Sequence, residues 1–278
     1  MRRHSNIAFI VLKYFLLLFA AFTTLFPFYM MVVSTFKTEA DYEANYFSLP
    51  KTFIVRNYTI FFNRFDVMRM TINSLIVSVV PVLILIVIVS MAAFIFTKAP
   101  FRYSNLIFTV ITACTFVPQV VILIPAYQMM SFFKLINHHI SLIFMYTARY
   151  IPYFLFLSYS YFKTTIPNEC VEAARIDGAN LFSIYVRIAM PLSKSVIITI
   201  FTLGVLWNWN ELLYAMLFLQ TEATRTLNVG IATIVGKRVT NMPLLFTGLF
   251  VNSIPMLILF LVGKNYIEKG LSDGSVKE

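Results

Sequence analysis

The sequence contains little charge. Only 12% of its 278 residues are Asp, Glu, Lys or Arg, whereas a soluble domain averages about 25%. Hydrophobic residues make up 59% of the chain, and the mean hydropathy is +0.80. The composition excludes a large soluble domain and predicts a polytopic membrane protein.

The sequence lacks the residue patterns of disulfide frameworks, metal sites, phosphate-binding loops and nucleic-acid binding. The two cysteines, Cys114 and Cys170, have no Cys or His partner at metal-ligand spacing, so neither a disulfide framework nor a metal site is expected. No Gly-rich loop ends in Lys-Ser or Lys-Thr, so the chain has no phosphate-binding loop. The Lys and Arg residues never form a run of five, which argues against nucleic acid. They favour charges that orient the chain and meet anionic lipid headgroups.

Long apolar stretches predict transmembrane helices, because backbone polar groups in lipid must be satisfied within the segment. We expect an all-α chain, residues 1–278, that forms one transmembrane domain. The first stretch is long enough to be an uncleaved span, although a basic N-terminus precedes it. The predicted spans are about 14–33, 73–96, 106–127, 140–162, 195–219 and 244–264.

The distribution of Lys and Arg predicts the orientation. Slightly more Lys and Arg residues lie on the side of the membrane that holds the N-terminus than on the opposite side. Because basic residues favour the cytoplasmic side, this predicts that both termini and the loop 163–194 are cytoplasmic. The longest outer segment, Ser34–Met70, mixes charges with aromatic residues. We expect it to form short helices on the membrane surface, with a docking surface for an extracellular partner as the alternative.

The loop 163–194 contains a short polar segment that favours a helix. Pro167 suits a first turn, where its missing N–H costs nothing. Glu169 and Glu172 lie near the positive end of the helix dipole and Arg175 near the negative end. Gly178 is a natural stop, because it can adopt the left-handed conformation.

A second short helix is predicted directly afterwards. Leu181, Ile184, Tyr185 and Ile188 recur at the spacing of one apolar helix face, and Pro191 is expected to end the helix. The loop is therefore predicted to be a helix, a glycine turn and a second helix at the membrane face.

Small side chains suggest what the first helix contacts. Ala173 and Ala174 keep one side thin, and the acidic residues disfavour anionic lipid. A groove on a partner protein fits these features better than lipid headgroups, although an amphipathic pair in the interface is the alternative.

The same segment resembles a known motif. The stretch Glu172–Ala179, followed by Met190-Pro191, resembles the EAA loop of ABC importer permeases, with Met190 where Leu is usual. The segment Trp207–Glu211 resembles the Trp-Asn-Asp/Glu element of the carbohydrate branch, in particular its maltose-type second permease. The tail Gly270–Lys277 resembles the C-terminal ending of that branch. The resemblance covers essentially the whole chain and implies the type I, MetI-like permease fold.

The resemblance also implies a mechanism and partners. The EAA loop of such permeases is a coupling helix that inserts into a groove on a cytoplasmic ATPase subunit. The chain is then a transport subunit rather than an enzyme, and it has no cofactor of its own, because ATP and Mg bind the partner. The implied partners are a second permease subunit, two ATPase copies, an extracellular or periplasmic sugar-binding protein and membrane lipid, at the bacterial cytoplasmic membrane. The implied contact residues are Glu172, Ala173, Ala174, Arg175, Asp177 and Gly178.

An ionisable residue within a span indicates function, because placing it there is costly. Arg149 lies midway along the fourth predicted span, and Tyr146, Tyr150 and Tyr153 share its helix face. Such a face offers hydrogen bonds and cation–π contacts to a sugar. The alternative is a structural Arg149 that pairs with Glu211 or with the partner permease.

Glu211 is the second such residue. With Trp207 and Tyr214 it is predicted to share one face of the fifth span, flanked by Asn208 and Asn210. Aromatic rings, amides and a carboxylate are groups that bind sugars. Alternatively the two asparagines bond helix to helix, or the sugar contacts mainly the partner permease.

Other functions remain to be distinguished. An ABC permease for another solute, such as glycerol phosphate or a peptide, would share the coupling loop. A secondary carrier or channel would predict internal repeats or a relay of charged residues in the membrane, and a membrane-embedded enzyme would need a catalytic constellation at depth. The predicted spans contain no internal repeat, no relay of charged residues and no catalytic constellation.

Overall fold

The computed structural model describes residues 7–235 and 241–274, and these are helical with no strand among them. The prediction of an all-α chain is confirmed. Part of the predicted C-terminal motif, residues 275–277, lies outside the described residues. So do several basic residues that entered the orientation argument, namely Arg2, Arg3, Lys237, Arg238 and Lys277.

The chain divides into two compact units, each described by itself. One comprises residues 1–66 and 231–254, and the other comprises residues 67–230 and 255–278. All the candidate site residues named above belong to the second unit.

The first unit contains the long helix α1 (Ile7–Ser34) and two short helices, α2 (Glu39–Ala44) and α3 (Arg56–Arg64). Short helices are present in the segment Ser34–Met70 as predicted, and its place on the outer membrane surface stays a prediction. Buried polar contacts hold the segment together: the Lys37 ammonium donates to two backbone carbonyls, and Asn57 donates to the carbonyls of Thr35 and Lys37 at 2.8 Å.

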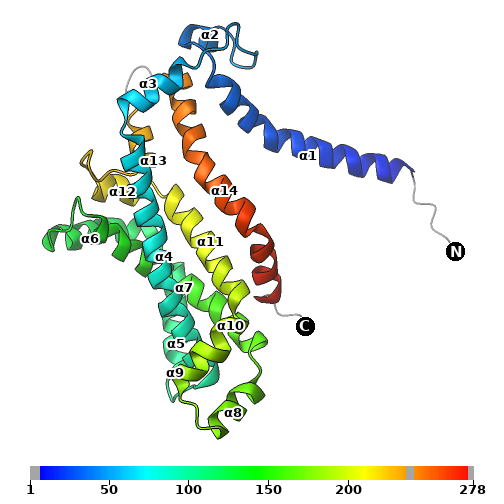
Figure 1. Cartoon of the computed structure of the whole chain (residues 1–278), viewed down its shortest axis with the longest axis vertical. Coiled ribbons are helices and arrows are strands. Elements are labelled where there is room, and N and C mark those ends of the chain that lie inside the picture. The colour runs from blue at the N-terminus through cyan, green and yellow to red at the C-terminus, as the bar shows by residue number, and fades with distance from the viewer. Residues whose placement is uncertain (1–6, 236–240, 275–278) are drawn as a thin grey trace. The chain divides into compact units, whose positions relative to one another are not determined.

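The second unit contains most of the helices (Figure 1). They are α4 (Val67–Lys98), α5 (Ser104–Ala113), η1 (Cys114–Phe116), α6 (Gln119–Phe132), α7 (His139–Thr165), α8 (Asn168–Ile176), α9 (Leu181–Ile184), η2 (Tyr185–Ala189), α10 (Met190–Leu192), α11 (Lys194–Asn210) and α12 (Leu213–Phe218). Helices α13 (Leu227–Ala232) and α14 (Met242–Gly274) each have residues in both units.

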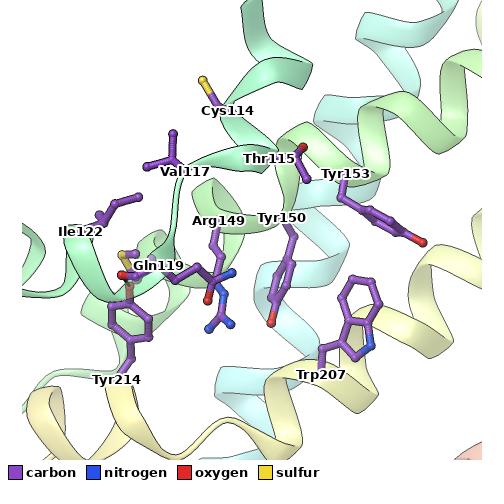
Figure 2. Close-up of a pocket in the computed structure, with 11 residues that line it drawn as sticks. Cys114, Thr115, Val117, Gln119, Ile122, Arg149, Tyr150, Tyr153, Trp207 and Tyr214 are labelled. Atoms are coloured by element: carbon purple, nitrogen blue, oxygen red, sulfur yellow. Dashed lines mark hydrogen bonds between the residues drawn. The ribbon is translucent and has the colours of Figure 1, made fainter.

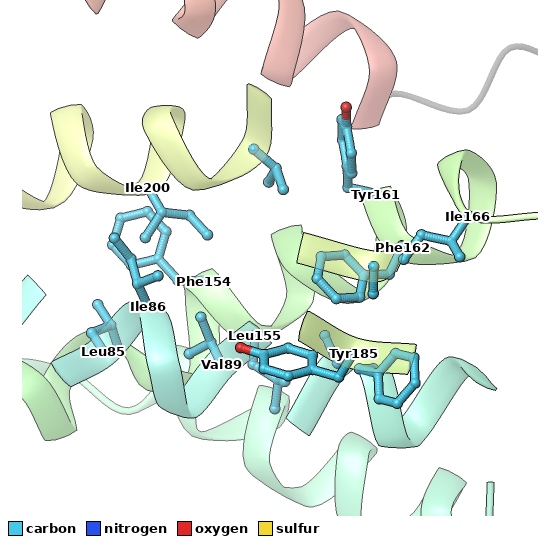
Figure 3. Close-up of a cluster of buried hydrophobic side chains, with 14 of the residues drawn as sticks. Leu85, Ile86, Val89, Phe154, Leu155, Tyr161, Phe162, Ile166, Tyr185 and Ile200 are labelled. Atoms are coloured by element: carbon cyan, nitrogen blue, oxygen red, sulfur yellow. The ribbon is translucent and has the colours of Figure 1, made fainter. Parts of the chain in front are cut away.

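The core of the second unit lies where α4 packs along α7 and α11. Figure 3 shows three residues of α4 (Leu85, Ile86 and Val89) together with Phe154 of α7 and Ile200 of α11. All five side chains are buried in one hydrophobic cluster. Gly204 permits the close approach of α11, because a Cβ there would lie 2.8 Å from the Val82 Cγ2.

Membrane-spanning length is reached in two ways. Among the described residues, four helices are long and apolar enough to span: 9–34, 67–98, 139–165 and 242–264. Two helix pairs reach the criterion only together, with bends of 100° (104–116 and 119–132) and 76° (181–192 and 194–210). The total is up to six spans if each bent pair counts as one.

The predicted third span, Leu106–Tyr127, is not one straight helix. It breaks at Val117, whose backbone is extended, and α6 begins after Pro118. The physical reason is that a residue before proline is disfavoured in the helical region.

The predicted fifth span, Ser195–Leu219, is also interrupted. Helix α11 ends at Asn210, Glu211 is extended, and the short α12 follows. The Glu211 carboxylate accepts hydrogen bonds from the backbone N–H groups of Tyr214 and Ala215, so a side chain replaces the helical bonding at this point.

Candidate functional site

Helix α8 ends as the sequence predicts, but it begins just after Pro167 and does not include Pro167 in its first turn. Pro167 is its N-cap residue and Ile176 its last residue. Gly178 has φ +80°, and the N–H groups of Gly178 and Ala179 donate to the carbonyls of Arg175 and Ala174 at 3.0 and 2.9 Å. These two bonds form a Schellman motif, which fixes the helix end.

Helix α8 has an inner and an outer face. Val171 is buried, and Ala174 packs against the core cluster. Glu172 and Ala173 are exposed, and Ile176 is 87% exposed. The outer face therefore combines a carboxylate, a small residue and a large apolar side chain.

Sequence reasoning missed Ile176. The signal was available, because Glu169, Glu172, Ala173 and Ile176 recur at i, i+3, i+4 and i+7, which is one helix face. The acidic residues were interpreted through the helix dipole, so the apolar residue beside them was overlooked.

Arg175 and Asp177 complete the predicted contact set. The Arg175 guanidinium donates from Nη2 to the Lys98 carbonyl at 2.8 Å, so it bonds within the chain. Asp177 is the exposed C-cap residue.

The second helix of the loop differs from the prediction in two respects. Ile184 and Tyr185 are buried as expected, but Leu181, the first residue of α9, is 40% exposed. The chain continues from α9 into a π-helical turn at Tyr185–Ala189. Pro191 does not end the helix. It lies in the first turn of α10, where it needs no N–H partner, and the helix continues to Leu192.

A cavity of about 230 Å³ lies among α7, α11 and the break between α5 and α6 (Figure 2). Its lining includes five residues predicted for the substrate pathway: Arg149, Tyr150, Tyr153, Trp207 and Tyr214. Its other lining residues are Cys114, Thr115, Val117, Gln119, Ile122 and Met145.

Arg149 lies between two aromatic rings at the cavity wall. Figure 2 shows its side chain between those of Tyr150 and Tyr214. The guanidinium carbon is 5.0 Å from the Tyr150 ring centroid and 5.5 Å from that of Tyr214. Its Nη1 lies 4.0 Å from the Glu211 Oε1. Arg149 thus faces Glu211 at the limit of an ion pair and also lines the cavity, so the structural and the pathway interpretations both stay predictions.

Glu211 occupies a different position from the one predicted. Its side chain is 8% exposed and does not line the cavity. Tyr146 Oη donates to its carboxylate at 2.7 Å, and the N–H groups of Tyr214 and Ala215 donate at 3.0 and 3.2 Å. The predicted shared helix face with Trp207 and Tyr214 does not exist, because α11 ends one residue before Glu211.

The two asparagines bond to backbone carbonyls. Asn208 is buried and donates from Nδ2 to the Ser78 carbonyl of α4 at 3.1 Å. Asn210 is exposed and donates to the Leu206 carbonyl of its own helix at 2.8 Å. Helix-to-helix bonding is thus present for Asn208 but not for Asn210.

The remaining wall of the cavity is aromatic. The Trp207 ring centroid lies 5.2 Å from those of Tyr150 and Tyr153. Aromatic faces can stack on the apolar C–H face of a sugar, and phenol and guanidinium groups can bond its hydroxyls. Sequence reasoning missed the lining that the α5–α6 break contributes (Cys114, Thr115, Val117, Gln119 and Ile122), because this pair was predicted as one helix, and it also missed Met145 of α7.

Comparison with known proteins identifies the family. Residues 62–271 match the model for the "binding-protein-dependent transport system inner membrane component". The chain belongs to this family of transport permeases. The permease is 31% identical, over 90% of its length and 91% of the relative's, to the "melibiose/raffinose/stachyose import permease protein MelC" of Bacillus subtilis (strain 168).

Other similar proteins agree with this assignment. The "multiple sugar-binding transport system permease protein MsmG" of Streptococcus mutans serotype c is 30% identical over 95% of this permease and 96% of its own length. A crystal structure of "a bacterial ABC transporter involved in the import of the acidic polysaccharide alginate" matches with a TM-score of 0.84 at 21% identity, covering 96% of this permease and 99% of that chain. The family and the helical fold establish a membrane-embedded ABC importer permease.

Proposed function

We propose that this permease imports a sugar or oligosaccharide across the bacterial cytoplasmic membrane, driven by ATP that a partner subunit hydrolyses. Both termini and the loop 163–194 face the cytoplasm in this proposal. A second permease, two copies of a cytoplasmic ATPase, an external sugar-binding protein and membrane lipid complete the assembly. ATP and Mg bind the ATPase, and this chain supplies no cofactor site.

The outer face of α8 is the observation that carries the proposal. A short helix with fixed ends presents Glu172, Ala173 and Ile176 away from its own core. An exposed isoleucine next to a thin alanine suits a protein groove, and Glu172 suits a basic group beside that groove. Gly178 adds the rigid turn, while Ala174 and Arg175 anchor α8 to the permease.

The cavity supports the second half of the proposal. Its aromatic wall and hydrogen-bonding groups suit a sugar, and its polar lining contains one guanidinium whose charge faces the Glu211 carboxylate. A volume of about 230 Å³ is below the roughly 300–1,000 Å³ of typical small-molecule sites. A second permease would complete the pathway. The names of the relatives above support sugars as the substrate class.

Co-purification tests the coupling. The tagged permease is expected to bring an ATPase subunit with it, and Glu172→Lys is expected to weaken that association by reversing the charge on the outer face. Glu43→Lys, the same charge reversal at an exposed residue of α2 in the first unit, is the matched control and is expected to keep the ATPase. Equal recovery of the ATPase with wild type and Glu172→Lys would refute the role of Glu172.

Sugar uptake tests the substrate class. Proteoliposomes that contain the assembled transporter and its binding protein are expected to accumulate an oligosaccharide such as raffinose only when ATP is enclosed with the ATPase. Uptake of glycerol phosphate or a peptide, and of no sugar, would favour the alternative solutes.

A further inference from the structure

A single residue holds both ends of α8. Lys98 is the last residue of α4 and is 8% exposed. Its ammonium donates to the Ile166 carbonyl at 2.6 Å and to the Asn168 Oδ1 at 2.7 Å, where α8 begins. Its backbone carbonyl accepts from Arg175 Nη2 at 2.8 Å, in the last turn of α8.

These bonds satisfy groups that helix ends leave unpaired. The last carbonyls of a helix lack partners within it, and the carbonyls of Lys98 and Ile166 lie at the C-terminal ends of α4 and α7. A buried ammonium would be costly without such acceptors. The Lys98 ammonium and the Arg175 guanidinium thus neutralise two helix termini and join three helices.

A second contact supports the same connection. In the π-helical turn, the Tyr185 hydroxyl shares a buried hydrogen bond of 2.7 Å with the Ser90 hydroxyl of α4. Both short helices of the loop are therefore bonded to the C-terminal part of α4, in addition to their covalent links to α7 and α11.

Helix α4 is also bonded to the two helices that carry the cavity wall, α7 and α11. The carbonyls near its Pro81 accept side-chain hydrogen bonds: Asn208 of α11 donates to Ser78, and Thr147 of α7 donates to Pro81. Pro81 lies about 26 Å from Lys98 along the helix, at a rise of 1.5 Å per residue. The same two helices carry Trp207 and Arg149 of the cavity.

We propose that Lys98 is a positioning residue that makes α4 move with α8, so that displacement of α8 by the ATPase reaches the transmembrane cavity through α4 as well as through α7 and α11. The proposal rests on the proposed coupling to an ATPase. It assigns to Lys98 a role in transmission, and Lys98 itself does not contact the ATPase.

Two native cysteines allow a test that needs no sugar. Cys114 lines the cavity and is exposed, while Cys170 is exposed on α8. With Cys170 replaced by Ser, the rate of Cys114 modification by N-ethylmaleimide reports on the cavity. In the assembled transporter, trapping the ATPase with ATP and orthovanadate is expected to change this rate.

Lys98→Met removes the ammonium and keeps the apolar stem. The ATP-dependent change in Cys114 labelling, normalised to the nucleotide trapped, is expected to fall about tenfold, the order expected for losing hydrogen bonds to a buried charge. Lys98→Arg is expected to restore most of it. Lys163→Met, which removes an exposed cation in the last turn of α7, is the control and is expected to keep the full change.

The outcomes separate this proposal from the proposed function. An unchanged response in Lys98→Met would overturn the role of Lys98 alone. If the wild-type complex binds an ATPase and traps nucleotide, yet Cys114 labelling does not respond, the coupling itself fails. If Lys98→Met does not assemble, the double variant Asn168→Ala with Arg175→Met removes a partner at each end of α8, and a full response there would also overturn the proposal.

Discussion

The Tyr146 hydroxyl donates a hydrogen bond of 2.7 Å to the Glu211 carboxylate. This bond joins α7 to the residue that directly follows the last residue of α11. The same carboxylate accepts from the first N–H groups of α12 and lies 4.0 Å from Arg149. Glu211 therefore organises the region behind the cavity wall.

Glu211→Ala is expected to destabilise the permease. The substitution leaves the buried Tyr146 hydroxyl and the start of α12 without an acceptor, which costs about 1–3 kcal/mol per unsatisfied group. Thermal unfolding of the detergent-solubilised permease measures the effect, with Glu211→Gln expected to lose less. Asn210→Ala is the neighbouring control. Unchanged stability together with abolished uptake would instead support direct contact between Glu211 and the sugar.

Tyr153→Ala is expected to lower sugar uptake with little effect on stability. Tyr153 is 37% exposed at the cavity, so its ring is available to stack against the apolar C–H face of a sugar. The raffinose concentration that gives half-maximal uptake in proteoliposomes measures the effect, and it is expected to rise in Tyr153→Ala. Phe144→Ala, on the same helix and 55% exposed outside the cavity, is expected to leave uptake unchanged. A similar loss in both variants would argue against the cavity as the pathway.

Gly178→Ala is expected to loosen α8 through backbone strain alone. No atom lies within 4 Å of a Cβ added there, but φ is +80°, and a left-handed conformation costs an L-residue roughly 1–2 kcal/mol. Hydrogen exchange of the α8 amides is expected to increase, and less so in Gly178→Asn. Gly178→Pro also removes the N–H donor to Arg175 and is expected to have a larger effect. Equal exchange in all variants would contradict the role of the Schellman motif.

Gly204→Ala is expected to separate α11 from α4. The added methyl group would meet Val82 Cγ2 at 2.8 Å in a fully buried contact, and overpacking of this kind costs about 1–3 kcal/mol. The thermal midpoint of the permease is expected to fall in the single variant and to recover partly in Gly204→Ala with Val82→Ala. Absence of recovery in the double variant would place the defect elsewhere.

The position of α8 was largely predictable from the sequence. The ends of α8 depend on local chemistry. A glycine follows the last turn as expected, whereas Pro167 is the N-cap residue and not, as predicted, part of the first turn. The bond from Arg175 to Lys98 was not predictable, because it joins residues 77 positions apart and depends on packing.

The cavity was predictable only in part. The helical spacing that placed Arg149, Tyr150 and Tyr153 on one face holds because α7 is continuous there. Spacing failed for Glu211, since hydrophobicity over a window does not reveal that a carboxylate replaces backbone hydrogen bonds. It also failed at Val117, where Pro118 marked the break but the apolar run continued on both sides.

The short halves of the bent helix pairs constrain how the chain enters the membrane. Helix α6 has 14 residues, so it is about 21 Å long, against a hydrocarbon thickness of about 30 Å. Alone it cannot reach from one interface to the other, and the extended backbone at Val117 has polar groups that lipid cannot satisfy. Stable insertion of this part of the chain must therefore depend on contacts with other helices, namely those of α5 and η1 with α7 and of α6 with α12.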